Sequence, residues 1–335
     1  MVDYLYKVIL KRKKRSVIEG ISLILLFIFC SLSRCKEKNL HSITVTGRRV
    51  LPDIPSVSGM EFVNGNFFII SDNTPWLYQL NDRYEILDTI QIAPTGNLKG
   101  NIFEKQAKPD FEGMALVAVE GKKELFIFGS GSKSPERNLL VCVAIENNNM
   151  VRAYCLDTFY QKILSDTKLK REALNIEGIA VKDKYLYLFN RGNNAIWEYE
   201  LEDFLAYLEG KKTWTEPHVY SILLPKYKNI QAGFSGATAI SGEPKIIFTA
   251  SVENTANWMD DGEVLGSYIG IVDLTQLKDQ YQPICIPILK EDKMLKIKAE
   301  SVCILPEKEQ RALCLVMATD SDGGASEIIK ARLNF

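Results

Sequence analysis

Histidine is scarce in this chain, because only His41 and His218 among the 335 residues carry an imidazole. Catalytic triads of the serine–histidine–carboxylate type and most zinc sites need a histidine beside other functional groups. His41 follows the N-terminal apolar segment, and His218 begins a predicted outer strand. We therefore expect neither a histidine-dependent triad nor a zinc site.

Two further signatures are incomplete, and the chain has no excess of charge. Residues 129–132 (Gly-Ser-Gly-Ser) lack the helix that a phosphate-binding loop needs, and residues 320–324 (Asp-Ser-Asp-Gly-Gly) lack the later ligand of an EF-hand. The formal net charge is −1, so no basic field favours a nucleic-acid polymer as partner. The composition, 46% hydrophobic and 25% charged, is that of a globular protein with a large core.

The N-terminal apolar run, residues 21–32, is shorter than a membrane-spanning helix, and the basic residues 11–15 precede it. This order is typical of a secretory signal. Cys35 resembles the acylated cysteine of bacterial lipoproteins, although Arg34 stands where such signals carry a small residue. An uncleaved anchor or cleavage elsewhere are the alternatives, and each places the folded part outside the cytoplasm.

We therefore divide the chain into a leader (residues 1–35), a short linker (36–41) and one folded domain (42–335). The expected location is extracytoplasmic, periplasmic or at the cell surface. The lipid anchor at Cys35 would be its only membrane attachment, and we expect a monomer.

Cysteine is sparse in the folded part, with Cys142, Cys155, Cys285, Cys303 and Cys314 remaining after the leader. Cys142 and Cys155 flank one predicted turn symmetrically, and Cys303 and Cys314 flank another. Each pair could therefore lie directly opposite across a hairpin. An exported protein can form disulfides, but cross-strand bridges strain the usual geometry. The alternative is that these cysteines are small apolar strand residues.

What the chain does contain is a repeat. Residues 110–116 (Asp-Phe-Glu-Gly-Met-Ala-Leu) have a close copy at 176–181 (Ile-Glu-Gly-Ile-Ala-Val) and looser copies at 58–62, 235–240 and 300–304. The polar residues that align in the five copies lie at positions 58, 112, 177, 235 and 300, so they are spaced by 54, 65, 58 and 65 residues. Repeats of this length, each opening with a polar residue and a strand, indicate a radial β-architecture.

Each repeat contains four predicted strands, except the last, which has three at residues 301–305, 312–319 and 327–333. Residues 42–50 are strand-like and precede the first repeat, so they can supply the missing strand. The prediction is an all-β fold, a five-bladed β-propeller of four-stranded blades closed by the N-terminal strand. One helix is expected at residues 202–208, inside the third repeat.

The first strand of a propeller blade lines the central channel, so the residues that open these strands should converge at one channel mouth. They are Ser58, Glu112, Glu177, Ser235 and Glu300. Three ionised carboxylates would repel one another there unless they were protonated or held a cation. An all-oxygen ring of this kind suits Ca²⁺ better than Mg²⁺. The alternative is a hydrogen-bonded plug that holds water.

The order Ser, Glu, Glu, Ser, Glu over five blades resembles the calcium-activated nucleotidases (apyrases). The Glu-Gly-Met-Ala and Glu-Gly-Ile-Ala strings also resemble bacterial propeller domains named for an esterase-like activity of phytase. The resemblance implies that these five residues form a calcium shell. The basic and aromatic strings with which nucleotidases contact nucleotides are missing. The resemblance therefore supports a calcium site more strongly than it supports the nucleotidase reaction.

Basic residues on the same predicted face would attract an anionic small molecule such as a phosphoester. The candidates for substrate binding are Lys108, Lys133, Arg137, Arg191 and Lys298. Asp72, or Glu253 in the predicted loop 251–266, is a candidate base. One hypothesis is therefore a calcium-dependent phosphohydrolase acting on a phosphoester or nucleotide. The other is a non-catalytic propeller that binds a glycan or protein, with calcium as a structural hub.

Overall fold

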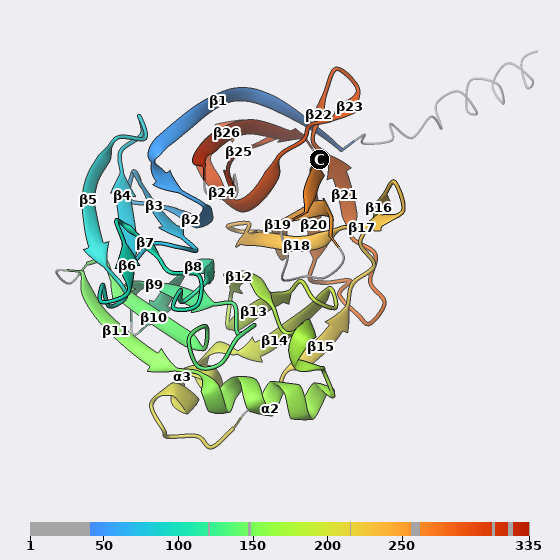
Figure 1. Ribbon diagram of the computed structural model, residues 1–335. Coiled ribbons are helices and arrows are strands. Elements are labelled where there is room, and N and C mark those ends of the chain that lie inside the picture. The colour runs from blue at the N-terminus through green and yellow to red at the C-terminus, as the bar shows by residue number, and fades with distance from the viewer. Residues whose placement is uncertain are drawn as a thin grey trace, which may run out of the picture. The chain divides into compact units, whose positions relative to one another are not determined.

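The computed structural model describes residues 41–119, 121–146, 149–214, 216–255, 262–309, 312–320 and 324–334. The predicted leader, residues 1–35, and nearly all of the predicted linker lie outside this part of the chain. The described residues form five four-stranded antiparallel sheets arranged around an axis (Figure 1). The predicted five-bladed β-propeller is therefore confirmed.

Each of the first four blades takes its strands in chain order from the axis outward. These blades consist of β2 (Val57–Val63), β3 (Asn66–Ser71), β4 (Trp76–Leu80) and β5 (Ile86–Gln91); β8 (Phe111–Val119), β9 (Lys122–Gly129), β10 (Leu139–Ala144) and β11 (Met150–Cys155); β12 (Ile176–Lys182), β13 (Tyr185–Asn190), β14 (Ala195–Glu200) and β15 (His218–Ser221); and β18 (Gly233–Ala239), β19 (Lys245–Asn254), β20 (Glu263–Asp273) and β21 (Ile284–Pro287). The innermost strands contact one another around the axis.

The fifth blade is completed from the other end of the chain. It contains β24 (Lys298–Glu309), β25 (Ala312–Asp320) and β26 (Ala325–Asn334), and β1 (Ser42–Pro55) is its outermost strand. β1 runs antiparallel to β26 from the pair Ser42–Asn334 to the pair Pro55–Ala325, as the adjacent blue and red ribbons show (Figure 1). This pairing confirms the predicted closure and covers a sheet edge that would otherwise be exposed.

Short elements fill the connections between consecutive blades, and the sequence did not predict them. Three are two-stranded hairpins, and the fourth is a helix followed by a single 3₁₀ turn. They are β6 (Leu98–Lys99) with β7 (Ile102–Phe103), β16 (Lys226–Tyr227) with β17 (Ile230–Gln231), β22 (Leu289–Lys290) with β23 (Lys293–Met294), and α2 (Asp157–Thr167) with η1 (Arg171–Ala173).

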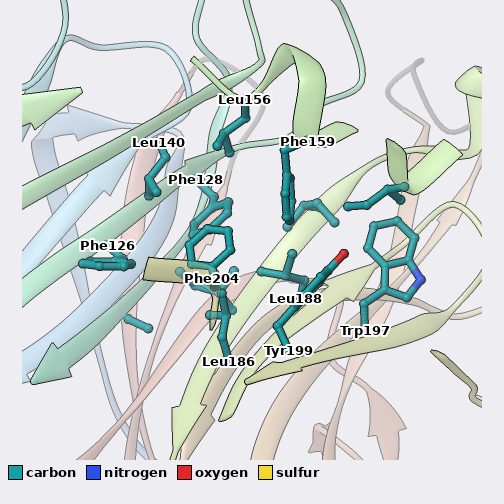
Figure 2. Packing of buried hydrophobic residues seen from close by; sticks show 14 of the residues in the cluster. Phe126, Phe128, Leu140, Leu156, Phe159, Leu186, Leu188, Trp197, Tyr199 and Phe204 are labelled. Atoms are coloured by element: carbon teal, nitrogen blue, oxygen red, sulfur yellow. The ribbon is translucent and has the colours of Figure 1, made fainter. Parts of the chain in front are cut away.

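The predicted helix at 202–208 is confirmed as α3 (Leu201–Leu208). α2 and α3 cover the aromatic core between the second and third blades (Figure 2). Phe159 of α2 is fully buried, and its ring lies 5.3 Å from that of Phe204 of α3 and 5.4 Å from that of Tyr199 of β14. The two helices therefore add an apolar layer to one side of the ring. Neither is long and apolar enough to cross a membrane, and the same holds for every helix in the described part of the chain.

The strand register separates the cysteines that the turns seemed to align. Cys142 lies opposite Arg152 and Cys155 opposite Leu139, a register that differs by three residues from a direct pairing of the two cysteines. Cys303 lies opposite Val316 and Cys314 opposite Leu305. The register therefore excludes the possibility of directly opposed pairs. The side chains of Cys142 and Cys303 are buried in the apolar core, as expected for small strand residues.

Candidate metal centre

The five predicted calcium ligands share one structural feature, because each occupies a β-bulge in the innermost strand of its blade. In β8 the pairing passes from Phe111–Gly129 to Gly113–Phe128 and skips Glu112. The other four skipped residues are Ser58, Glu177, Ser235 and Glu300. A bulge redirects a side chain and breaks the pairing locally. The strands thus begin one or two residues before the predicted ligands, and the bulge turns each ligand out of the regular alternation.

The glycine after the bulge lets neighbouring inner strands approach closely. A Cβ atom at Gly178 would lie 2.9 Å from the carbonyl carbon of Gly236 in the next blade. A Cβ atom at Gly236 would lie 2.7 Å from the carbonyl oxygen of Glu300 in the blade after that. The small residue in the repeated string is therefore required by backbone contacts, which bring the five bulges together around the axis.

Three of the five ligand candidates meet directly. Glu112, Glu177 and Glu300 each place a carboxylate oxygen within 4.8 Å of the others. Burial raises the pKa of all three carboxyls, and neighbouring carboxylates raise it further. Lys298 opposes the shift at Glu300, and Arg191 opposes it at Glu177. Such a group of carboxyls favours a bound cation or retained protons.

The hydrogen bonds of these glutamates leave oxygen atoms free to bind an ion. Oε1 of Glu177 accepts a hydrogen bond of 2.7 Å from the side-chain amide of Asn175. Oε1 of Glu300 is buried and accepts no hydrogen bond from a described residue, although Nζ of Lys298 lies 3.3 Å away. The donor set is entirely oxygen, so it fits the hard cation expected from the sequence.

The two serine candidates connect adjacent blades. The Ser58 hydroxyl donates a hydrogen bond to the carbonyl oxygen of Phe111 in the second blade. The Ser235 hydroxyl donates at 2.6 Å to the carbonyl oxygen of Ala299 in the fifth blade. Both serines are buried at the same bulge position as the glutamates. Their hydroxyl oxygens keep lone pairs, so their role as ligands stays a prediction.

A second acidic group adjoins the first and includes a residue to which the sequence analysis assigned no role. Asp72, Asp110 and Glu112 also place carboxylate oxygens within 4.8 Å of one another. Lys108 contacts both aspartates, at 2.5 Å from Asp72 and 2.8 Å from Asp110, and Arg137 lies 2.6 Å from Asp110. Burial would raise the pKa of Asp110, but Lys108 and Arg137 hold it below its usual value. The sequence could have suggested Asp110 as a site residue, because it lies two residues before Glu112 in the repeated string.

Arg191 and Lys298 belong to a network of buried ion pairs. Arg191 donates to Glu253 at 2.5 Å and to the Ser251 hydroxyl at 2.8 Å, so it joins the third blade to the fourth. Lys298 lies 3.9 Å from Glu253 and 3.5 Å from Asp320. These basic groups, predicted to bind substrate, therefore already contact carboxylates.

Glu253 and Lys133 lie in surroundings that differ from those expected. Glu253 is not in a loop, because β19 and β20 continue past the predicted strand ends and pair Glu253 with Val264. Its carboxylate is buried against Arg191. Lys133 lies 3.4 Å from Glu136 and donates a hydrogen bond to the carbonyl of Gln106. Lys133 is absent from the described lining of the cavity at the channel mouth.

This cavity has a volume of about 120 Å³ and brings the two acidic groups together. Its described lining contains seven carboxylates and five basic groups. The carboxylates are Asp72, Asp110, Glu112, Glu177, Glu253, Glu300 and Asp320, and the basic residues are Lys105, Lys108, Arg137, Arg191 and Lys298. With all groups ionised, the excess of two negative charges equals the charge that one divalent cation would balance.

The fold and this cavity define a class: a five-bladed β-propeller with a buried acidic centre at one mouth of its channel. The chain belongs to the family of unknown function DUF6929, whose model matches residues 53–333. No curated protein matches the chain.

Several solved structures are similar to this chain at low sequence identity. Myxococcus xanthus glutaminyl cyclase is 11% identical with a TM-score of 0.49, and the match covers 88% of this chain and 97% of that one. The α-L-arabinanase of Cellvibrio cellulosa is 12% identical with a TM-score of 0.43, covering 83% and 91%. A DUF4221 family member from Bacteroides vulgatus is 8% identical with a TM-score of 0.41, covering 89% and 100%.

Proposed function

We propose that the protein binds one Ca²⁺ ion at the channel mouth and uses it to hydrolyse a small phosphoester or nucleotide outside the cytoplasm. The observation that carries this proposal is the convergence of Glu112, Glu177 and Glu300 from three blades within 4.8 Å. Ser58 and Ser235 occupy the equivalent bulges and complete an oxygen-rich ring. A ring assembled from separate blades suits the flexible coordination of calcium better than the strict octahedron of magnesium.

The space beside these ligands supports the catalytic part of the proposal. The cavity that the three glutamates line also exposes Lys108, Arg137, Arg191 and Lys298. When bound, calcium would supply positive charge to polarise a phosphoryl oxygen. A cation beside Glu300 would also weaken the hold of that carboxylate on Lys298, which could then contact a substrate anion.

Asp72 is the better of the two candidate bases. It lines the cavity, and its Oδ1 atom is buried without a hydrogen bond from any described residue. Oε1 of Glu253 lies 2.5 Å from Arg191 and 3.2 Å from the Ser251 hydroxyl. Lys108 contacts only the other oxygen of Asp72, Oδ2, at 2.5 Å. Asp72 could therefore accept a proton from a water molecule in the cavity.

A second candidate function rests on the ion pairs. Lys108, Arg137, Arg191 and Lys298 each contact a carboxylate, so the cavity presents little uncompensated positive charge to an anion. This arrangement favours a non-catalytic propeller in which calcium joins the blades and loops at the mouth bind a glycan or protein. Propellers serve both kinds of function.

A phosphoester panel that includes nucleoside diphosphates, assayed with calcium and with chelator, separates the two functions. The phosphohydrolase proposal predicts calcium-dependent release of phosphate that is lost in Glu177→Gln and Asp72→Asn. The exposed substitution Glu104→Gln is the matched control and should retain activity. Calcium binding by the unmutated protein without turnover of any ester would favour the second function.

The proposed location rests on the leader, which lies outside the described residues. We propose export directed by residues 1–35 and lipid attachment at Cys35. Mass spectrometry of the membrane-extracted protein should find a lipid-modified N-terminus at Cys35, and Cys35→Ser should release the protein from the membrane. An intact Met1 on a cytosolic protein would contradict both expectations.

A further inference from the structure

The opposite mouth of the channel contains a second and larger cavity. Its volume is about 530 Å³, and its described lining comes from the innermost strands of all five blades. None of the residues that line it also lines the acidic cavity. The two cavities therefore represent separate sites.

A layer of apolar side chains closes the channel between them. Each blade contributes the residue two positions after its bulge, and all five are buried: Met60, Met114, Ile179, Ala237 and Val302. The cavity beside this layer measures only about 10 Å³, which is space for about one water molecule at most. A ligand in one mouth would therefore not reach the other.

Beyond this layer, a second apolar ring surrounds the larger cavity. Each blade contributes the residue four positions after its bulge, and all five are half-buried and line the cavity: Phe62, Leu116, Val181, Ala239 and Ile304. The repeated geometry thus presents five apolar side chains to one cavity. Such a wall suits an apolar ligand body.

One acidic side chain interrupts this wall. Glu61 lines the cavity, whereas the equivalent positions in the next two blades are occupied by Ala115 and Ala180. Oε1 of Glu61 accepts a hydrogen bond of 3.3 Å from the backbone amide of Leu116. The described lining contains no lysine, arginine or histidine. The carboxyl therefore has no basic partner on the cavity wall.

We propose that this cavity binds a small organic ammonium ion, with the charged nitrogen at Glu61 and an apolar body against the five-membered ring. A single carboxylate cannot supply the six to eight oxygen ligands that calcium needs, so a metal ion is a poor match. A neutral apolar molecule would exclude water from the carboxyl without adding a partner to the Leu116 amide, which is unfavourable. An organic ammonium ion would pair its charge with Glu61 and place its apolar body against the five apolar side chains.

The pKa of Glu61 agrees with a carboxyl in an apolar cavity without a basic partner on its wall. Burial raises it from 4.5 to about 8, although the Leu116 amide opposes the shift. A cation close to the carboxyl would favour its ionised form again. This proposal does not depend on the calcium centre or on the proposed hydrolase activity.

Calorimetric titration with cyclohexylammonium, and with cyclohexanol as a neutral match of similar shape, tests the proposal. The unmutated protein should bind the ammonium ion about tenfold or more tightly than the alcohol, since hydrogen bonds to charged groups contribute at least this much. Glu61→Gln keeps the size of the side chain and should remove this preference. The control Glu104→Gln should leave it unchanged.

A second variant covers the case in which Glu61→Gln disturbs folding. Ala239→Phe should narrow the cavity, keep the carboxylate and weaken the binding of both probes. The proposal is wrong if the alcohol binds as tightly as the ammonium ion, if neither probe binds at millimolar concentrations, or if Glu61→Gln binds the ammonium ion normally. Removing calcium with a chelator should leave ammonium binding intact, which separates this site from the metal centre.

Discussion

At the scale of single residues, the close packing of the innermost strands depends on glycines, which have no Cβ atom. Gly178 lies so close to the next blade that the three atoms nearest to an added Cβ atom would all be backbone atoms, at 2.9 to 3.2 Å. Backbone held in a sheet cannot move aside easily. Gly96 offers the opposite case, because it is exposed and a Cβ atom there would meet no atom within 4 Å.

Gly178→Ala should therefore destabilise the protein by roughly 1–3 kcal/mol, the usual cost of overpacking. Gly96→Ala should change the free energy of unfolding by less than about 0.5 kcal/mol. Denaturant unfolding of both variants measures the difference. Equal stability of the two variants would mean that the inner strands are not closely packed.

Glu61 makes stability depend on pH. Its pKa is about 8 in the folded protein and near 4.5 in the unfolded chain, so the folded state retains a proton that the unfolded state releases. Its contribution is therefore fully present below about pH 4.5 and is lost as the pH rises toward 8. Glu61 also raises the pKa of Cys303, which lies above this range mainly because the thiol is buried.

We expect the stability of the unmutated protein, relative to Glu61→Gln, to fall by up to a few kcal/mol between these pH values. Urea unfolding at several pH values, with both proteins in the same buffers, measures this difference and cancels the titration of other groups. A difference that does not vary with pH would show that the Glu61 pKa is not raised.

At the scale of elements, α2 and α3 stabilise one interface between blades. The ring of Phe159 contacts aromatic rings from α3 and β14, and its side chain is fully buried (Figure 2). The outer strand β5 offers a contrast in Leu87, which is 55% exposed.

Phe159→Ala should cost roughly 3–5 kcal/mol, because it removes a large buried ring and leaves a cavity. Leu87→Ala should remain within about 0.5 kcal/mol of the unmutated protein. Thermal and denaturant unfolding of the two variants gives the comparison. A small effect of Phe159→Ala would indicate that α2 does not contribute to the stability of the folded ring.

At the scale of the whole molecule, the proposed ion would join separate blades. Three glutamates from the second, third and fifth blades meet near the axis, and their mutual repulsion opposes closure of the ring. A calcium ion at this point would stabilise the folded ring and bind the unfolded chain weakly, so binding and stability are linked.

Chelation should therefore lower the melting temperature. At free calcium about a hundredfold above Kd, the stabilisation is about 2.7 kcal/mol. Glu177→Gln should lose most of this response, whereas Glu104→Gln should keep it. Identical melting in calcium and in chelator, after verified removal of metal, would refute the central-calcium hypothesis and leave the protein as a binding module without a central ion.

The sequence alone determined the number of blades, their inner strands and the closing strand, because repeat spacing and strand patterns are local properties. It also identified Glu112, Glu177 and Glu300 as neighbours, since equivalent positions of a radial repeat meet at the axis. The tertiary structure decided what those positions contact. Glu253, the partner of Arg191, and Asp72, one partner of Lys108, lie in other blades or loops, and no spacing in the chain encodes such distances. The sequence did not predict the site at Glu61 for the same reason, because its cavity forms only when the five innermost strands come together.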